Sequence, residues 1–105
     1  MNPPEPTLAE LIEPEMTALI VVDMQNDYCS KDGGMQKLLM KVDFVQEMAP
    51  RLASFIRSCR KHGISIIHTM NTHSDFTDTE SWRRLGGSRL NLARRGSEGE
   101  KWFGK

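Results

Sequence analysis

The fold is most directly predicted by Ala18-Leu19-Ile20-Val21-Val22-Asp23-Met24-Gln25-Asn26-Asp27. An apolar run of five residues leads straight into a carboxylate, and such a run is typical of a strand buried on both faces of a parallel sheet. Asp23 then stands at the carboxyl end of that strand. Because ligands of open α/β sheets bind at this edge, Asp23 is the first candidate for a functional residue.

A long helix and a second strand are predicted further along the chain. Between Asp43 and His62, apolar residues recur at spacings of three and four, which indicates one helix face. Pro50 lies inside this pattern, so we expect a kink or a later helix start. Gly63 suits the end of the helix, and residues 64–70 follow as a strand. Strand, helix and strand together predict a βαβ unit.

The rest of the chain predicts little regular structure. Residues 1–16 are expected to be a loose N-terminal arm with a helical turn at 8–13, and residues 25–34 and 72–78 are expected to be loops. A helical turn is predicted at 79–85, and residues 86–105 are expected to be irregular. Two strands rarely form a stable sheet alone, and parallel sheets need helices on both faces. We therefore expect residues 1–105 to be the N-terminal part of one larger α/β domain.

Composition excludes several classes of partner. The chain has 14 acidic and 14 basic residues, so no overall charge points to nucleic acid or to an anionic membrane. We interpret the arginines of the last third as solvated surface: Arg83, Arg84, Arg89, Arg94 and Arg95. Two cysteines without a secretory signal favour a reducing compartment, and no segment has the ~20 apolar residues of a membrane helix. We expect a cytoplasmic protein.

From its position alone, Asp23 is equally consistent with a general base and with a structural cap. The run from Ala18 to Cys29 resembles the opening strand of the isochorismatase-like cysteine hydrolases. This superfamily includes isochorismatases, nicotinamidases, N-carbamoylsarcosine amidases and ureidoacrylate amidohydrolases. The resemblance continues along the chain, more loosely after about residue 70: Arg60-Lys61-His62-Gly63, residues 64–69, His73-Ser74-Asp75-Phe76-Thr77-Asp78, Trp82, Arg95-Gly96-Ser97 and Trp102-Phe103-Gly104.

The resemblance implies a Rossmann-like, three-layer α/β/α fold with a parallel sheet, of which this chain holds roughly the first βαβ unit and a loop region. It also implies an Asp-Lys-Cys triad in which Asp23 takes the proton of the cysteine thiol. In the family, the lysine and the nucleophilic cysteine both come later than the position of Lys105. We therefore expect the 105 residues alone to be inactive. For Cys29 and Cys59 we expect structural roles.

Three further residues are candidates for substrate contact. Asn71 matches an asparagine that the resemblance to ureidoacrylate amidohydrolases assigns to the substrate, although a turn-stabilising role stays open. Gln25 is a second candidate that also orders the loop after Asp23. Trp82 either forms a wall of the pocket or packs in the core. Nicotinamidases carry an Asp-x-His-x-x-His metal site, but here Asn71 replaces the aspartate and the second histidine is missing. We expect no metal and no other cofactor.

The resemblance favours an amidase that cleaves a C–N bond of a small amide or ureido substrate. Two alternatives stay open at this point. One is an isochorismatase that cleaves a vinyl ether, and the other is a non-catalytic α/β module that only binds a partner. The expected partners are a small-molecule substrate and, for the full-length protein, further copies of the same chain.

Overall fold

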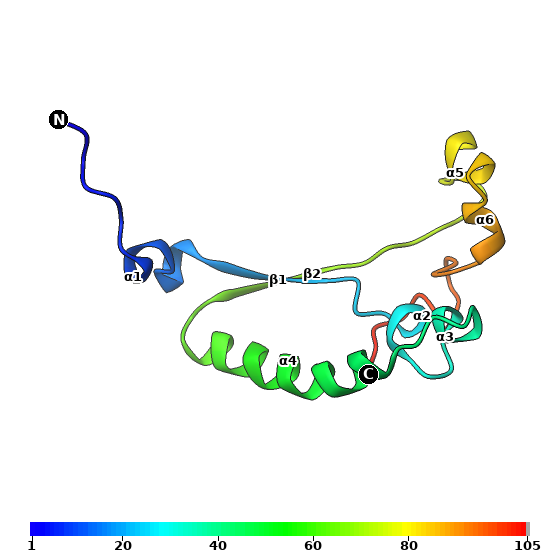
Figure 1. Cartoon of the computed structure of the whole chain (residues 1–105), viewed down its shortest axis with the longest axis horizontal. Coiled ribbons are helices and arrows are strands. Elements are labelled where there is room, and N and C mark those ends of the chain that lie inside the picture. Colours follow the sequence, from blue (N-terminus) through cyan, green and yellow to red (C-terminus); the bar gives the residue numbers. More distant parts are fainter. Residues whose placement is uncertain (105) are drawn as a thin grey trace.

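The computed structural model describes the backbone of residues 1–104 and all of their side chains except those of Ser88 and Arg89. Strands β1 (Ala18–Val22) and β2 (Ser65–Thr69) pair in parallel, with Ala18 opposite Ser65 and Val22 opposite Thr69. Helix α4 (Asp43–Lys61) connects the two strands (Figure 1). The predicted βαβ unit is therefore confirmed, and the strands expected at residues 17–23 and 64–70 are each one residue shorter at either end.

Helix α4 forms as its apolar periodicity predicts. It runs from Asp43 to Lys61 with Pro50 inside it, so the later helix start is not observed. Pro50 is exposed, and because proline has no N–H it removes one backbone hydrogen bond from the helix. Val45 and Cys59 are buried on the helix face that the spacing identified. Gly63 follows with a φ of 78°, a conformation that glycine adopts without strain.

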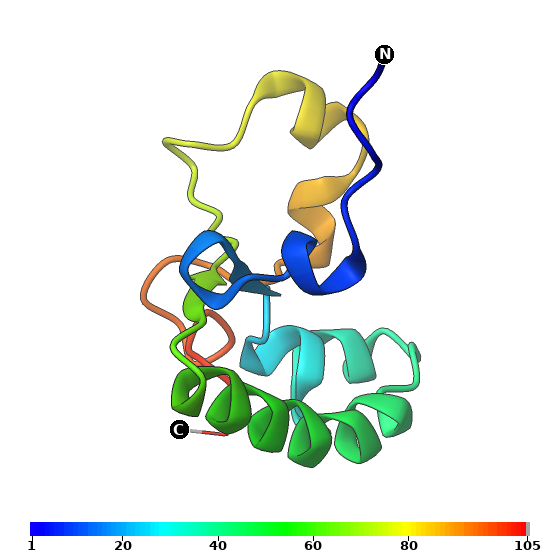
Figure 2. The same cartoon turned by 90° about the vertical axis from the view of Figure 1, so that its left-hand side faces the viewer.

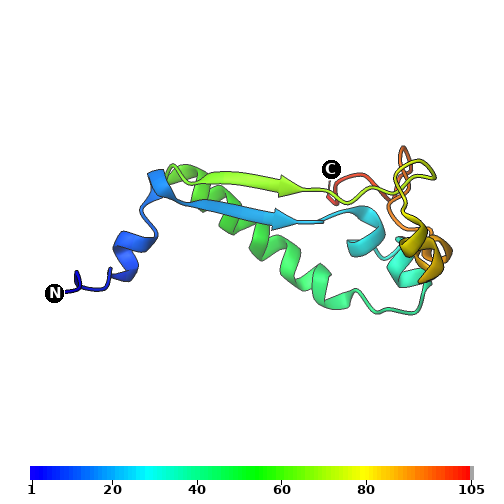
Figure 3. The same cartoon turned by 90° about the horizontal axis from the view of Figure 1, so that it is seen from above.

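Helix α4 covers one face of the two strands (Figures 1 and 3). Val21 is buried on the strand, whereas its neighbours Ile20 and Val22 are 57% and 62% exposed. Ile67, which pairs with Ile20, is 49% exposed. Both faces of the sheet are thus apolar, as in a buried parallel sheet, while a helix of the described chain covers only one of them.

Short helices account for most of the remaining regular structure. Two lie in the N-terminal arm, α1 (Leu8–Leu11) and η1 (Pro14–Met16), and α5 (Glu80–Arg84) confirms the helical turn predicted at 79–85. The loop predicted at 25–34 contains α2 (Asn26–Cys29) and the start of α3 (Gly34–Lys37), so that prediction is wrong at both ends. Residues 86–104 include α6 (Gly87–Leu90). Helix α1 lies before the start of the strands, whereas α2, α3, α5 and α6 lie beyond their carboxyl ends (Figures 1 and 2).

Within the described residues, no helix is both long and apolar enough to cross a bilayer.

The segment after α6 folds back onto the loop that follows β1. The N–H of Asn26 donates to the carbonyl of Lys101 at 2.9 Å, and the N–H of Asp27 donates to Gly99 at 3.0 Å. The N–H of Phe103 donates to Met24 at 2.9 Å. Phe103 also packs with other partly buried apolar residues on a small core formed by Cys29, Val42 and Val45. These long-range bonds stabilise α2 from outside, which explains why local sequence did not predict it.

Asp27 anchors this returning segment through both carboxylate oxygens. Its Oδ1 accepts the N–H of Gly34 at 2.8 Å, and its Oδ2 accepts the N–H of Ala93 at 2.7 Å. Gly99 packs so closely that a Cβ there would lie 2.0 Å from Oδ2 of Asp27. The carboxylate therefore joins the nearby start of α3 to the distant C-terminal segment that contains Ala93 and Gly99.

We expect Asp27→Asn to lower the free energy of unfolding by about 1–3 kcal/mol, because the amide has one acceptor oxygen where the structure uses two. Its NH₂ group would face a backbone N–H of Gly34 or Ala93. Urea unfolding followed by circular dichroism measures the change. Asp32→Asn, at an exposed position in the same loop, is the matched control. Equal stability of the two variants would contradict this role of Asp27.

Candidate active site

The site lies where both strands end. The backbone N–H of Asp23 donates to the carbonyl of Thr69 at 3.1 Å, which extends the parallel ladder by one step. The hydroxyl of Thr69 donates to Oδ1 of Asp23 at 3.1 Å. Asp23 has a φ of 51°, an uncommon value for a residue with a side chain. The end of β2 thus holds both the backbone and the carboxylate of Asp23, which stays partly exposed.

Gln25 is completely buried directly behind this edge. Its Nε2 donates to the carbonyls of Asn71 and Glu100, both at 2.7 Å. Its Oε1 accepts the N–H of Asn71, also at 2.7 Å. The side chain therefore pairs with the backbone of Asn71 much as a neighbouring strand would. This geometry gives Gln25 a positioning task, and its contact with substrate stays a prediction.

The side chain of Asn71 extends toward Tyr28, a residue that the sequence had not singled out. Its Nδ2 donates to the hydroxyl oxygen of Tyr28 at 2.9 Å. Burial raises the pKa of Tyr28, the hydrogen bond from Asn71 acts in the opposite direction, and the charges of Asp23 and Asp27 raise it further. Tyr28 is thus a neutral hydroxyl group at neutral pH. Tyr28 directly follows Asp27 in the run from Ala18 to Cys29, and this position could have indicated that it lies near Asp23.

A cavity of about 390 Å³ lies in front of these residues. It is lined by Asp23, Tyr28, Met35, Asn71, His73, Trp82, Leu90 and Leu92. Three of the four predicted site residues, Asp23, Asn71 and Trp82, therefore line one cavity, whereas Gln25 does not. Its size is in the range of pockets for small molecules, and its mainly apolar wall carries a few convergent polar groups.

A second cavity, of about 300 Å³, lies between α4 and the strands. Its lining is apolar apart from His68 and includes Ile56 and Trp102. It contains none of the predicted site residues and no carboxylate. We therefore place the candidate active site at the strand ends, where a carboxylate, an amide and a hydroxyl converge.

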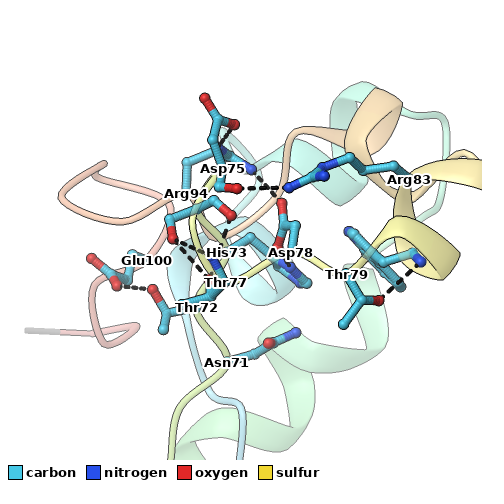
Figure 4. Close-up of polar contacts among 12 residues, drawn as sticks. Asn71, Thr72, His73, Asp75, Thr77, Asp78, Thr79, Arg83, Arg94 and Glu100 are labelled. Atoms are coloured by element: carbon cyan, nitrogen blue, oxygen red, sulfur yellow. Dashed lines mark hydrogen bonds and ion pairs between the residues drawn. The ribbon is translucent and has the colours of Figure 1, made fainter.

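A charged network supports the far wall of the candidate active site (Figure 4). Nδ1 of His73 lies 2.8 Å from Oδ1 of Asp78, and Nη1 of Arg94 donates to Oδ2 of Asp78 at 2.8 Å. The other end of the Arg94 guanidinium donates to Asp75 at 2.7 Å. The ring of His73 stacks on Trp82, with centroids 4.7 Å apart and planes 8° from parallel.

This network corrects the interpretation of Arg94 as part of a solvated arginine surface. For His73, the sequence predicts only a position in the loop at residues 72–78. In the structure, His73 lines the cavity and Arg94 is half-buried in ion pairs with Asp75 and Asp78. The polar stretch from His73 to Asp78 could have indicated the contact between these two residues, which lie only five positions apart. The side chain of Arg89 lies outside the described part of the chain.

Asp78 is ionised in the folded chain. Burial favours its neutral form, but hydrogen bonds from His73 and Arg94 outweigh burial and lower the pKa of the Asp78 carboxyl. The side chain of Asp78 is only 4% exposed, so these two partners provide most of its polar contacts. The stacked position of His73 on Trp82 depends on this buried carboxylate.

Both cysteines lie away from the cavity. Cys29 and Cys59 are buried free thiols, at 3% and 5% exposure. Burial raises the pKa of Cys29, which opposes formation of a thiolate. Their placement fits the structural roles expected for them, and Lys105 lies outside the described residues. In the described chain, no three His, Cys, Asp or Glu side chains form a metal-binding group.

A family model described as the isochorismatase domain matches residues 17–104. The match includes β1, α4, β2 and every residue that lines the candidate active site. The chain belongs to this family and is a hydrolase of the cysteine hydrolase superfamily with an α/β fold. The resemblance inferred from the sequence is therefore confirmed.

The lowered pKa of Asp78 predicts how stability depends on pH. In acid, the unfolded chain binds a proton at the ordinary Asp pKa of 3.8, while the folded chain binds it only at lower pH. The contribution of Asp78 is therefore fully present above about pH 5 and is lost as the pH falls through the lowered value. Urea unfolding midpoints of the wild type should fall through this range more steeply than those of Asp78→Asn.

Glu100, whose pKa is lowered by hydrogen bonds from Thr72 and the backbone of Gly96, titrates in the same direction in both proteins. The difference between the two curves therefore isolates Asp78. Parallel curves for wild type and Asp78→Asn would contradict the proposed ion pairs.

Proposed function

We propose that the protein is an amidase of the cysteine hydrolase superfamily that cleaves a C–N bond of a small amide or ureido substrate. The observation that carries this proposal is the shared cavity of Asp23, Asn71 and Trp82 at the strand ends. It combines a carboxylate for proton transfer, a carboxamide for a polar substrate and an aromatic wall, which together suit a small planar amide.

In this proposal, Asp23 accepts the proton of a cysteine thiol. A thiol with a pKa of about 8.5 is only a few per cent thiolate at neutral pH, so a neighbouring base increases its reactivity. Because the hydroxyl of Thr69 holds Oδ1 of Asp23, Oδ2 is the oxygen that we assign to the proton. The family resemblance supports a lysine ammonium as the third member, which would stabilise the thiolate.

Asn71 is the residue that we assign to substrate recognition. Its Nδ2 is engaged with Tyr28, so its carbonyl oxygen is the group proposed to accept an N–H of an amide or ureido substrate. Gln25 fixes the backbone of Asn71 from behind. Trp82, stacked on His73, would cover one side of the ligand.

The second candidate function is binding of a small amide without turnover. The burial of both cysteines away from the cavity favours it. Cys29 and Cys59 are buried and do not line the candidate active site. Taken alone, the 105 residues are therefore expected to bind a small amide without hydrolysing it.

A binding titration with N-carbamoylglycine as the probe tests this expectation. In ¹H–¹⁵N NMR spectra of the 105-residue chain, we expect the probe to shift the signals of the Trp82 indole N–H and the Asn71 side-chain amide. Asn71→Ala should weaken binding about tenfold, the loss of one hydrogen bond to a polar ligand. Asn2→Ala, in the exposed arm, is the matched control.

Ammonia release, measured in the same samples, should stay at the level of buffer. Release that Asp23→Asn abolishes would contradict the expected inactivity of these residues. If the probe leaves all site signals unchanged, the assignment of a ureido substrate is wrong.

A further inference from the structure

Tyr28 and Asn71 form a hydrogen-bonded pair in the wall of the candidate active site. Gln25 fixes both members of this pair. Its backbone carbonyl accepts the N–H of Tyr28 at 3.1 Å, and its side chain binds the backbone of Asn71 on both sides. The ring of Tyr28 also packs on the small core around Cys29. The two polar groups of the pair are therefore held in place before a ligand binds, which lowers the entropic cost of binding.

The pair leaves one donor and one acceptor for a ligand. The hydroxyl oxygen of Tyr28 receives its hydrogen bond from Nδ2 of Asn71, and no described residue accepts the hydroxyl hydrogen. Burial raises the pKa of Tyr28, so this hydrogen is retained at neutral pH. No described residue donates to Oδ1 of Asn71. Because every buried polar side-chain atom of the described chain has a partner, Oδ1 is open to the cavity that Asn71 lines.

The available donor and acceptor lie close together. The hydroxyl oxygen of Tyr28 is 2.9 Å from Nδ2 of Asn71, and the N and O atoms of one amide are about 2.2 Å apart. The hydroxyl of Tyr28 and Oδ1 of Asn71 are therefore no more than about 5 Å apart. One amide group of a ligand reaches both only if its carbonyl oxygen and an N–H point to the same side, an arrangement that we call the syn edge.

The syn edge separates amides into two groups. Primary carboxamides, carbamoyl groups and cyclic lactams all have it. An open-chain secondary amide is almost entirely trans, so its carbonyl oxygen and its N–H point in opposite directions. Such an amide forms a hydrogen bond with only one member of the pair at a time.

We propose that Tyr28 is a specificity-determining residue whose hydroxyl donates to the carbonyl oxygen of the substrate, while Oδ1 of Asn71 accepts the syn N–H of the same amide. This inference rests on the proposed amidase function and narrows its substrates to amides with a syn edge. Without the hydroxyl, Asn71 alone would accept an N–H from either kind of amide. Asp23 lines the same cavity, so the bound amide lies beside the proposed base.

Three small amides test the proposal in NMR titrations of the 105-residue chain. Propanamide and N-methylacetamide are isomers, but only propanamide presents a syn edge. The third amide, 2-pyrrolidinone, is a secondary amide whose ring fixes the syn edge. From the signals of the Asn71 side-chain amide and the Trp82 indole N–H, we expect propanamide to bind at least about tenfold more tightly than N-methylacetamide, the effect of one hydrogen bond. The affinity of 2-pyrrolidinone should be close to that of propanamide.

The variant Tyr28→Phe removes the hydroxyl and keeps the ring. It should bind propanamide about tenfold more weakly, while its affinity for N-methylacetamide changes little because Asn71 still accepts an N–H. The ratio of the two dissociation constants should therefore fall to near one. General damage to the site would weaken both isomers and leave the ratio unchanged, so the ratio reports the hydroxyl itself. The control Ser58→Ala removes an exposed hydroxyl from α4 and should keep the wild-type ratio.

Equal affinities of the wild type for the two isomers, or a ratio that persists in Tyr28→Phe, would overturn the proposal. Binding of 2-pyrrolidinone as weak as that of N-methylacetamide would also overturn it, because the NH₂ group and not the syn edge would then decide. If one of these results occurs while N-carbamoylglycine still shifts the site signals, the proposed function stands and the assignment of Tyr28 is wrong. If no amide shifts them, N-carbamoylglycine included, both are wrong.

A second measurement needs no variant and applies if Tyr28→Phe does not fold. Tyr28 is the only tyrosine of the chain, so a tyrosine ¹³Cζ label gives a single signal that responds to hydrogen bonding of the hydroxyl. Saturating propanamide should shift this signal in the wild type. A signal that stays in place would overturn the proposal.

Discussion

The side-chain amide of Gln25 is the contact on which the candidate active site depends. It is completely buried, and a buried amide is tolerated only where its polar atoms find partners. The partners are the N–H and the carbonyl of Asn71 together with the carbonyl of Glu100. One side chain therefore joins the loop after β1, the loop after β2 and the returning C-terminal segment. Asp23 and Asn71 face one cavity because these three segments meet there.

The regular part of the fold follows from local sequence. The apolar run of residues 18–22, the helical periodicity of residues 43–61 and the apolar stretch of residues 65–69 each carry their own signal, so the βαβ unit could be predicted. Asp23 could be predicted for the same reason, since its motif is continuous. The short helix α2 could not, because bonds from Gly99 and Lys101, more than 70 residues away, stabilise it.

The walls of the candidate active site depend on contacts between residues that are far apart in the sequence, so they could not be predicted from local patterns. His73 is fixed by Asp78, and Asp78 by Arg94, sixteen residues further on. An arginine that stabilises a buried carboxylate cannot be told from a solvated one by composition alone. Asp27 and Gly99 show the same limit, since only the fold brings the carboxylate against a residue without a side chain. The sequence thus predicts Asp23 as the acid of a candidate site, and tertiary contacts build the cavity that Asp23 lines.

Amide hydrogen exchange at Asn71 tests most directly whether Gln25 holds the site together. In the wild type, the N–H of Asn71 donates to Oε1 of Gln25, so its exchange should be protected. Gln25→Ala should speed that exchange at least about tenfold, equivalent to ~1.4 kcal/mol, while Ile67 in β2 keeps its protection. Gln46→Ala, which removes a hydrogen bond to the carbonyl of Cys29, is the control. An unchanged exchange rate at Asn71 in folded Gln25→Ala would contradict the account.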